Sequence, residues 1–323
     1  MAIAYLGHAG GLTVVDGVDG QAPSTARRLD GRRVTAVATA GTELVLAGTF
    51  EDGLYRAVDG GGFERVGART IASDRVTAVA TDSNGGWYAG TEPSRLYHSD
   101  DGGEHWHEVD SLLEVPSAST WSFPPRPSTH HVRWVEPDPG DPDRLIVGIE
   151  AGALLLSEDG GETWVDRPPG SRVDNHTLAT HPEAPGRVYA AAGDGYAEST
   201  DGGRRWTHPE AGLEHRYVWG LAVDPANADA VVVSAAHGAS DAHRRGRAVA
   251  YRREGDGPWH RLEAPVVSPA GGCFRAVLAA GPRAIYGASD RGVARSGDGG
   301  RTWSALDVDP PGTPPRALRV VAG

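Results

Sequence analysis

Residues 157–164 read SEDGGETW, and close variants of this stretch occur at residues 99–106, 199–206 and 296–303. Weaker copies lie at residues 57–63 and 253–259. The aspartates Asp59, Asp101, Asp159 and Asp201 follow one another at intervals of 42, 58 and 42 residues. A repeat period of roughly 40–50 residues is typical of β-propellers and solenoids. The sequence therefore predicts an array of similar structural units.

Each unit has the composition of a small antiparallel sheet. Between residues 75 and 110 the runs RVTAVATD, GWYAGTE, RLYHSDDGG and HWHEVD are rich in β-forming residues and are separated by turn residues. We expect the serine and aspartate of each box to bond local backbone, the glycines to adopt positive φ, and the tryptophan to pack between units. The boxes lack the further oxygen ligands and the distal glutamate of an EF-hand, so a structural turn is favoured over a calcium loop.

The boxes closely resemble the Asp-box, or BNR, repeat, and the resemblance extends over nearly the whole chain. It implies a β-propeller like those of sialidases, sortilin-type receptors and the photosystem II assembly factor. It implies no single activity, because the repeat occurs in enzymes and in scaffolds.

The number of blades follows from the number of units. Six units begin near residues 33, 75, 131, 175, 217 and 274. The remaining N-terminal β-rich runs and the C-terminal run PRALRVVAG, residues 315–323, are enough for one more blade. We therefore predict an all-β fold, a single seven-bladed β-propeller domain over residues 1–323 with four-stranded antiparallel blades. The C-terminal run is predicted to be the inner strand of the last blade, which leaves no free sheet edge there.

Composition limits the kinds of partner and location. The formal net charge is −12 with no basic stripe, so nucleic acid is not an expected partner. The single cysteine, Cys273, excludes an intrachain disulfide framework. The N-terminus does not read as a signal peptide, and no apolar run is long enough for a membrane span. We expect a cytoplasmic protein with no membrane partner.

Polar residues that the repeat does not require mark the candidate site. When the inner strands are aligned, their first positions are Arg33, Arg75, His131, Asp174, Tyr217 and Cys273. Two residues further on stand Thr35, Thr77, Arg133, His176, Trp219 and Arg275. The second strands of the blades lead into His8, Glu92, Glu150, Asp194, His237 and Asp290. In a propeller these positions share one face, around the central channel.

Three interpretations of this set stay open. His131, His176, His237 and His8, with Glu150, could bind zinc, manganese, iron or copper, although no HxH or HExxH spacing supports a metal. Arg75, Arg133, Arg216 and Arg275 could bind a carboxylate or phosphate. A sialidase-like site would be a form of this second interpretation and would pair such arginines with Tyr217 and Glu150, but the FRIP-type motif is absent. The third interpretation is that these polar side chains only form hydrogen bonds that line a water-filled channel.

Two insertions are expected over the same face, at residues 110–129 and 237–248. The first carries Trp121, Phe123 and several prolines and could be a lid that supplies a stacking surface. The second contributes His243, Arg244 and Arg245. Each insertion could equally be a lobe that only covers an exposed rim.

These observations favour an intracellular enzyme that acts on a small polar or anionic molecule, as a hydrolase or lyase that uses a divalent transition metal. The expected catalytic residues are Tyr217, Glu150, Arg133 and Arg275. The expected substrate-binding residues are Trp121, Arg75, Arg216 and Trp219. The alternatives are a non-catalytic binding or assembly propeller and a sialidase-like glycoside hydrolase. For Cys273 we favour a packed structural residue over a catalytic nucleophile.

Overall fold

The computed structural model describes residues 1–20, 22–309 and 312–323, and in this part of the chain the β-strands form seven small antiparallel sheets. The predicted all-β fold is confirmed: the chain is a seven-bladed β-propeller. Among the described residues, no helix has the length and apolar character needed to cross a lipid bilayer.

Contacts between Cα atoms divide the chain into two compact units. The first unit comprises residues 1–34, 193–196 and 209–323, and the second comprises residues 35–192 and 197–208. The boundary passes between Val34 and Thr35 and runs through the turn and strand that follow residue 192.

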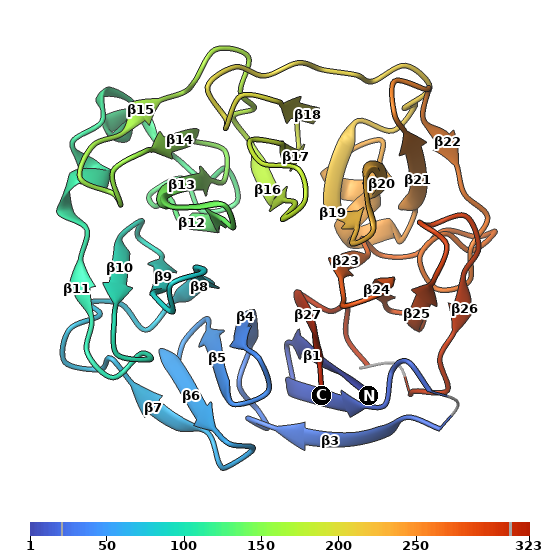
Figure 1. Ribbon diagram of the computed structural model, residues 1–323, viewed down its shortest axis with the longest axis horizontal. Coiled ribbons are helices and arrows are strands. Elements are labelled where there is room, and N and C mark those ends of the chain that lie inside the picture. The colour runs from blue at the N-terminus through green and yellow to red at the C-terminus, as the bar shows by residue number, and fades with distance from the viewer. Residues whose placement is uncertain (21, 310–311) are drawn as a thin grey trace. The chain divides into compact units, whose positions relative to one another are not determined.

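The second unit holds the first three blades and most of the fourth (Figure 1). The strands of the first blade are β4 (Val34–Ala40), β5 (Leu44–Thr49), β6 (Leu54–Val58) and β7 (Glu64–Val66). Those of the second are β8 (Val76–Thr81), β9 (Trp87–Thr91), β10 (Leu96–Ser99) and β11 (His107–Glu108). The third contains β12 (Val132–Asp138), β13 (Asp141–Ile149), β14 (Ala153–Ser157) and β15 (Val165–Asp166).

The fourth blade departs from the predicted four strands. It contains β16 (Asn175–Thr180), β17 (Val188–Ala192) and β18 (Gly195–Ser199). An isolated bridge between Glu198 and Thr207 replaces a fourth strand among the described residues.

The first unit holds the other three blades. The fifth is formed by β19 (Tyr217–Asp224), β20 (Asn227–Ala236), β21 (Val249–Glu254) and β22 (His260–Arg261). The sixth contains β23 (Val277–Ala280), β24 (Ile285–Ser289), β25 (Gly292–Ser296) and β26 (Ser304–Ala305). The seventh combines the two termini, in the order β27 (Ala317–Ala322), β1 (Ala2–His8), β2 (Gly11–Asp16) and β3 (Ser24–Arg28).

The seventh blade confirms the predicted closure by the C-terminus. Strand β27 pairs antiparallel with β1 from Ala2 opposite Ala322 to Gly7 opposite Ala317. Backbone hydrogen bonds along this pair join the N-terminal and C-terminal strands. Strand β27 is thus the inner strand of this blade.

The box turns have the predicted local bonding. In the box at residues 157–164 the Ser157 hydroxyl donates to the Asp159 carboxylate at 2.8 Å and accepts from the Gly161 amide at 2.8 Å. The Asp159 carboxylate also accepts from the Thr163 amide at 2.9 Å. Gly161 has φ of +95°, a conformation that side chains rarely adopt. The aspartate is thus occupied by its own turn.

Neighbouring blades within each unit are held together by apolar side chains. Trp106, from the box of the second blade, packs with Leu46 and Leu54 of the first blade and with Trp87 and Tyr97. Its indole Nε1 donates to the Gly103 carbonyl at 3.0 Å, which satisfies the polar end of the buried ring. The box tryptophan therefore packs between blades, as the sequence predicts.

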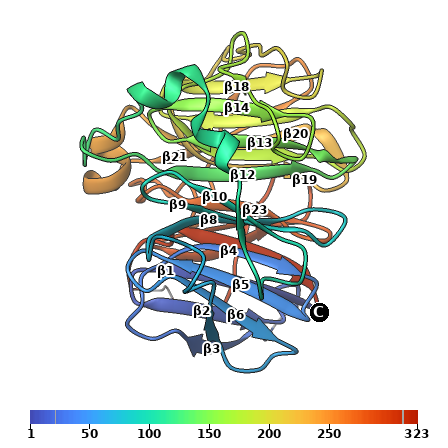
Figure 2. The same ribbon diagram turned by 90° about the vertical axis from the view of Figure 1, so that its left-hand side faces the viewer.

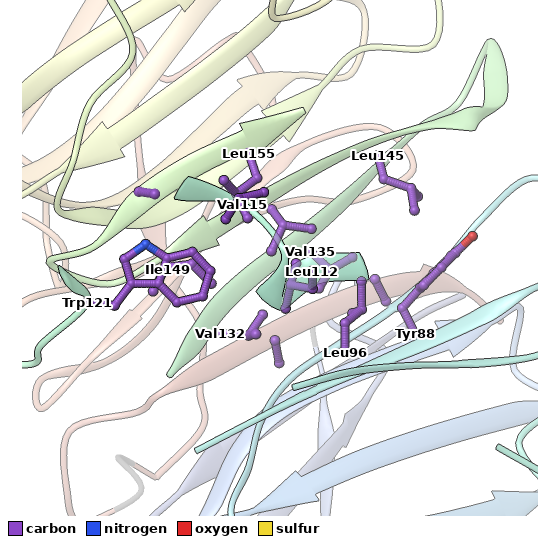
Figure 3. Close-up of a cluster of buried hydrophobic side chains, with 14 residues drawn as sticks. Tyr88, Leu96, Leu112, Val115, Trp121, Val132, Val135, Leu145, Ile149 and Leu155 are labelled. Carbon is purple, nitrogen blue, oxygen red and sulfur yellow. The ribbon is translucent and has the colours of Figure 1, made fainter. Parts of the chain in front are cut away.

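The first insertion is fastened to the third blade. Two 3₁₀ turns, η1 (Asp110–Leu113) and η2 (Pro116–Thr120), lie against this blade (Figure 2). Leu112, Val115 and Trp121 pack into a core with Ile149 and other residues of the blade, and Figure 3 shows Trp121 beside Ile149. Residues 110–121 are therefore a packed lobe.

The box turn yields a stability prediction. We expect Ser157→Ala to lower the free energy of unfolding by about 1–2 kcal/mol, because the buried Gly161 amide loses its acceptor. The midpoint of urea unfolding measures the change, provided that the denaturant slope stays constant. Glu162→Ala, an exposed position in the same box, is the control and should change stability by less than about 0.5 kcal/mol. Equal effects of the two substitutions would contradict a structural role for the serine.

Candidate functional site

In the second unit, β-bulges at the start of the inner strands determine the direction of candidate side chains. In β8, β12 and β16 the register shifts by one residue, and the extra residues are Thr77, Arg133 and His176. The same shift occurs in β19 of the first unit, at Trp219. Such β-bulges leave one residue outside the ladder and turn its side chain away from strict alternation. The position chosen by aligning the strands is thus a bulge in four blades.

In the first two blades the equivalent threonines act between blades. The Thr35 hydroxyl donates to the Val76 carbonyl at 2.7 Å, and the Thr77 hydroxyl donates to the Val132 carbonyl at 2.6 Å. Both bonds are buried and run from one inner strand to the next. The third and fourth blades have arginine and histidine at this position.

Glu150, directly after β13, is the centre of the candidate site. One of its carboxylate oxygens, Oε2, accepts from His131 Nε2 at 2.9 Å and lies 3.4 Å from Arg133 Nε. The other oxygen, Oε1, lies 3.7 Å from His176 Nε2. Glu150, His131 and His176 are buried. The structure therefore brings together four of the residues that the sequence singled out.

Two opposing effects act on the charge of Glu150. Burial raises the pKa of this carboxyl group, but the hydrogen bond and charge of His131 and the charges of His176 and Arg133 lower the pKa by more. The net result is a pKa of about 2. Glu150 is therefore a carboxylate at neutral pH, and its low pKa suits it to bind a cation or a protonated imidazole and not to accept a proton.

A second buried carboxylate, Glu92, lies one blade earlier, directly after β9. Its Oε1 accepts from Arg75 Nη1 at 3.1 Å and from Arg126 Nε at 2.8 Å, and its Oε2 contacts Arg126 Nη2. The Arg126 guanidinium lies between two aromatic rings, 5.0 Å from the centre of Phe50 and 4.7 Å from that of Phe123. Arg75 thus forms an ion pair with Glu92, and its expected role in substrate binding stays a prediction.

His131 lies between the two carboxylates. Its Nε2 bonds Glu150, and its Nδ1 lies 3.9 Å from Glu92 Oε2, beyond hydrogen-bond distance. The Phe123 ring packs edge-on against the imidazole at 4.8 Å. The neighbouring His130 is half-buried, and burial together with the charge of His131 lowers its pKa. The loop of residues 122–129 therefore supplies the Phe123 ring that packs against His131.

A third carboxylate completes a possible ligand set. Asp174, directly before β16, has its Oδ1 atom 3.8 Å from His176 Nε2. Ligand atoms of Glu150, Asp174 and His176 lie within 4.8 Å of one another. His131 is hydrogen-bonded to this group.

The first unit contains a separate group of predicted site residues. The Tyr217 hydroxyl bonds His243 Nε2 at 2.8 Å, and the Trp219 ring packs edge-on against His243 at 4.7 Å. The Arg275 guanidinium lies 4.5 Å from the centre of the Trp219 ring, and Arg275 Nη1 donates to the Pro315 carbonyl at 3.3 Å. His243 belongs to the π-helical turn η3 (Asp241–Arg245) of the second insertion. Three predicted residues, Tyr217, Trp219 and Arg275, thus share one cluster.

Other predicted residues of the first unit have local partners. His8 accepts from the Gly10 amide at Nδ1, and its Nε2 bonds the Thr13 hydroxyl, both at 3.1 Å. Burial, with the charge of Arg27, lowers the pKa of His8. His237 is exposed and stacks on His215 at 3.9 Å. Arg216 is exposed and lies 3.6 Å from Glu210. Metal binding by His8 and His237 together with His131 and His176 stays a prediction.

Trp121 lies in the core of the third blade, with only 6% of its surface exposed. Its Nε1 donates to the Ser117 hydroxyl at 2.9 Å, and Ser117 in turn bonds the Asp166 carboxylate. The ring also packs edge-on against His130 at 5.5 Å. A stacking role toward a substrate stays a prediction for this residue.

Sequence reasoning placed Glu92 and Asp174 at aligned positions on the candidate face and Phe123 in the first insertion, but it gave no catalytic, binding or metal role to these residues or to Arg126. Glu92 and Glu150 hold the same position after the second strand of consecutive blades. Alignment of these positions could therefore have identified Glu92 as a site residue. Asp174 likewise shares its position with His131. Arg126 and Phe123 lie in the insertion and have no counterpart in other blades, so no repeat pattern could identify them.

Glu92 provides a test of the charge arrangement. We expect Glu92→Gln to lower the free energy of unfolding by about 3 kcal/mol, the low end for buried pairs because both guanidinium groups are half-exposed. Chemical denaturation measures the change. Glu108→Gln, which removes the surface partner of Arg95, should cost less than about 1 kcal/mol. An effect of Glu92→Gln as small as that of the control would show that the two arginines do not depend on this carboxylate.

Cys273 provides a second test. Burial, with the charge of Asp290, raises the pKa of its thiol to about 12, so the thiolate is scarce in the folded protein at neutral pH. We expect iodoacetamide at pH 8 to label the native chain about 100-fold more slowly than the urea-unfolded chain. Intact mass over time measures labelling. Rapid labelling of the native chain would contradict the burial and restore the cysteine as a candidate nucleophile.

No protein-family model matches the chain, and no curated protein matches it in sequence. Solved structures do match. A GH74 enzyme from Niastella koreensis is 17% identical, with a TM-score of 0.71 over 94% of this chain and 52% of the enzyme. YCF48 bound to D1 peptide is 18% identical, with a TM-score of 0.59 over 86% of this chain and 83% of YCF48. A protein from Lactobacillus plantarum is 12% identical, with a TM-score of 0.69 over 99% of both chains.

These identities are low, so the likeness shows the fold alone. The chain spans about half the length of the GH74 enzyme. The neighbours include GH74 enzymes and YCF48, and they share the β-propeller fold with this chain.

Proposed function

We propose that the chain is an enzyme, a hydrolase or lyase that acts on a small polar or anionic molecule at the group around Glu150. The observation that carries the proposal is the buried Glu150 carboxylate, which contacts His131 on one oxygen and faces His176 on the other. Buried ionisable groups of this kind, gathered at the ends of strands, are typical of catalytic sites.

Each residue has a proposed role. His131 exchanges a proton with the substrate, because a buried imidazole in hydrogen-bond contact with a carboxylate can act as an acid or a base. Glu150 holds the imidazole and stabilises its protonated form. Arg133 holds the negative charge of the substrate, since its guanidinium borders Glu150 and can form paired hydrogen bonds with an anion. A divalent transition metal, zinc, manganese, iron or copper, is part of the proposal. It would polarise the substrate or activate a water molecule.

The box geometry supports the proposed relation to Asp-box repeat proteins, because all four clear copies bond serine to aspartate in the same way. A cytoplasmic location, with no nucleic-acid or membrane partner, belongs to the same proposal.

A non-catalytic binding propeller is the second candidate. The similarity to YCF48 favours it, because that protein was solved with a bound peptide and matches this chain over most of both lengths. Under this alternative the groups around Glu150 and Glu92 are structural, and a partner chain binds elsewhere.

The test is a turnover screen with the full chain in the presence of Mn²⁺ or Zn²⁺. Small phosphate esters, carboxylate esters, lactones, hydroxy acids and sialosides are followed by NMR. We expect Glu150→Gln to lower kcat/KM by about 1,000-fold, because His131 and the proposed metal both lose the carboxylate that they contact. Arg133→Met should raise KM about 10-fold. Arg204→Met, which alters an exposed ion pair with Glu158, is the control and should leave both constants within about two-fold.

Three results would contradict the proposal. Turnover that survives both Glu150→Gln and Arg133→Met would place the chemistry elsewhere. Hydrolysis of a sialoside that Tyr217→Phe abolishes would favour the sialidase-like alternative. Neither turnover nor thermal stabilisation by any compound in the screen would favour the binding propeller.

A further inference from the structure

We propose that Glu150, Asp174 and His176 are the protein ligands of one divalent metal ion, and that His131 orients Glu150 from outside the ligand set. The inference rests on the proposed function for the use of the metal and names its ligands within the same site. It keeps His176 and Glu150 from the set expected from the sequence and adds Asp174, which the fold places beside His176. His131, His237 and His8 are not ligands in this set.

The spacing of the three groups fits a common ion. Nε2 of His176 lies 3.7 Å from Glu150 Oε1 and 3.8 Å from Asp174 Oδ1. Both distances are too long for a hydrogen bond. Two ligands of a tetrahedral ion with bonds of about 2.1 Å lie about 3.4 Å apart. Small side-chain movements would therefore close the set around an ion.

The two oxygens of Glu150 are divided between two tasks. Oε2 accepts the hydrogen bond from His131 and faces Arg133, whereas Oε1 faces His176. Carboxylates that bind metals are themselves hydrogen-bonded by neighbouring groups, which fix their orientation. His131 fulfils that role here, and the Phe123 ring packed on its edge restrains the imidazole.

The backbone around the other two ligands is also fixed. Oδ1 of Asp174 accepts from the Ala151 amide at 3.0 Å, which joins it to the turn that follows Glu150. Asn175, between the two ligands, is fully buried and donates to the Arg172 carbonyl at 2.9 Å. The bulge at His176 lets this side chain and that of Asp174 serve one site.

The charges also favour a cation. Glu150 and Asp174 supply two carboxylates, and Arg133 Nε lies 3.4 Å from Oε2 of Glu150. With neutral imidazoles, as metal ligation requires, these three side chains have a formal charge of −1. A dication would be attracted by both carboxylates, whereas an anion at the same point would be repelled by them.

A second triad in the described residues provides a matched comparison. Ligand atoms of Asp101, Glu104 and His105 also lie within 4.8 Å of one another, but all three residues are exposed. The Asp101 carboxylate already accepts from the Ser99 hydroxyl and from the Glu104 and His105 amides within its own box. We attribute no metal to this triad, and His105 serves as the control.

The donor set limits the choice of ion. Two carboxylates and one imidazole suit Mn²⁺, Fe²⁺ or Zn²⁺, while soft ions such as Cu⁺ prefer thiolate and thioether ligands. Mn²⁺ is the convenient probe, because the EPR signal of the free ion disappears on binding.

The experiment titrates Mn²⁺ into the metal-free full chain and counts bound ions by EPR. We expect one ion per chain, with competition by Zn²⁺. Glu150→Gln, Asp174→Asn and His176→Gln should each weaken binding by at least about 100-fold, and His131→Gln by about 10-fold. His105→Gln should have no effect. Asp174 is partly exposed, so Asp174→Asn tests the site with little risk to folding, which circular dichroism checks.

Absence of Mn²⁺ and Zn²⁺ binding by the wild type would overturn the inference. Unchanged affinity in Asp174→Asn or loss of affinity in His105→Gln would do the same. The two proposals fail separately. Turnover by a chain that binds neither Mn²⁺ nor Zn²⁺ overturns the metal site and leaves the enzymatic part of the proposed function. Stoichiometric metal binding without turnover of any substrate overturns the proposed function and leaves the metal site.

Discussion

Hydrophobic contact between neighbouring blades is the constraint on which the rest of the structure depends. A sheet of four short strands cannot bury enough apolar surface by itself, so each blade must cover the face of the next. In the second unit Trp106 extends from one blade onto Leu46 and Leu54 of the preceding blade. The box turn that holds this tryptophan is fixed by its serine and aspartate, which explains why the box recurs with so little change.

The same close packing determines how charged groups are accommodated. Glu92 and Glu150 follow the second strands of consecutive blades and are buried there, where an ionised carboxylate needs compensating partners. Glu92 is compensated by two guanidinium groups, both of which pack on aromatic rings. Glu150 is compensated by His131, His176 and Arg133, groups that can also exchange protons or bind ligands. Equivalent positions thus differ in chemistry because different partners surround them.

The sequence was sufficient for the fold and for part of the site. The six repeat units and the β-rich terminal runs predicted the number of blades, and the pairing of β27 with β1 agrees with the predicted closure. Alignment of the inner strands also identified Arg133 and His176, and alignment of the second-strand exits identified Glu150. It could not reveal the bulges, because an extra residue in one strand is defined only by its partner strand. The alignment also could not show that residues 110–121 pack on the third blade. Nor could it show that Phe123 contacts His131 and that Arg126 binds Glu92, since these contacts join different parts of the chain. His8 matched the pattern, but its bonds are made within its own hairpin.

The bulge at the start of the inner strands has a consequence for how such a protein can change over time. Its residue lies outside the ladder, so a substitution there leaves the pairing of the strands intact. In this one molecule the position is occupied by Thr77, Arg133, His176 and Trp219, a hydroxyl, a guanidinium, an imidazole and an indole. A repeat protein of this design can therefore acquire chemistry one blade at a time, while the copies that remain ordinary preserve its architecture.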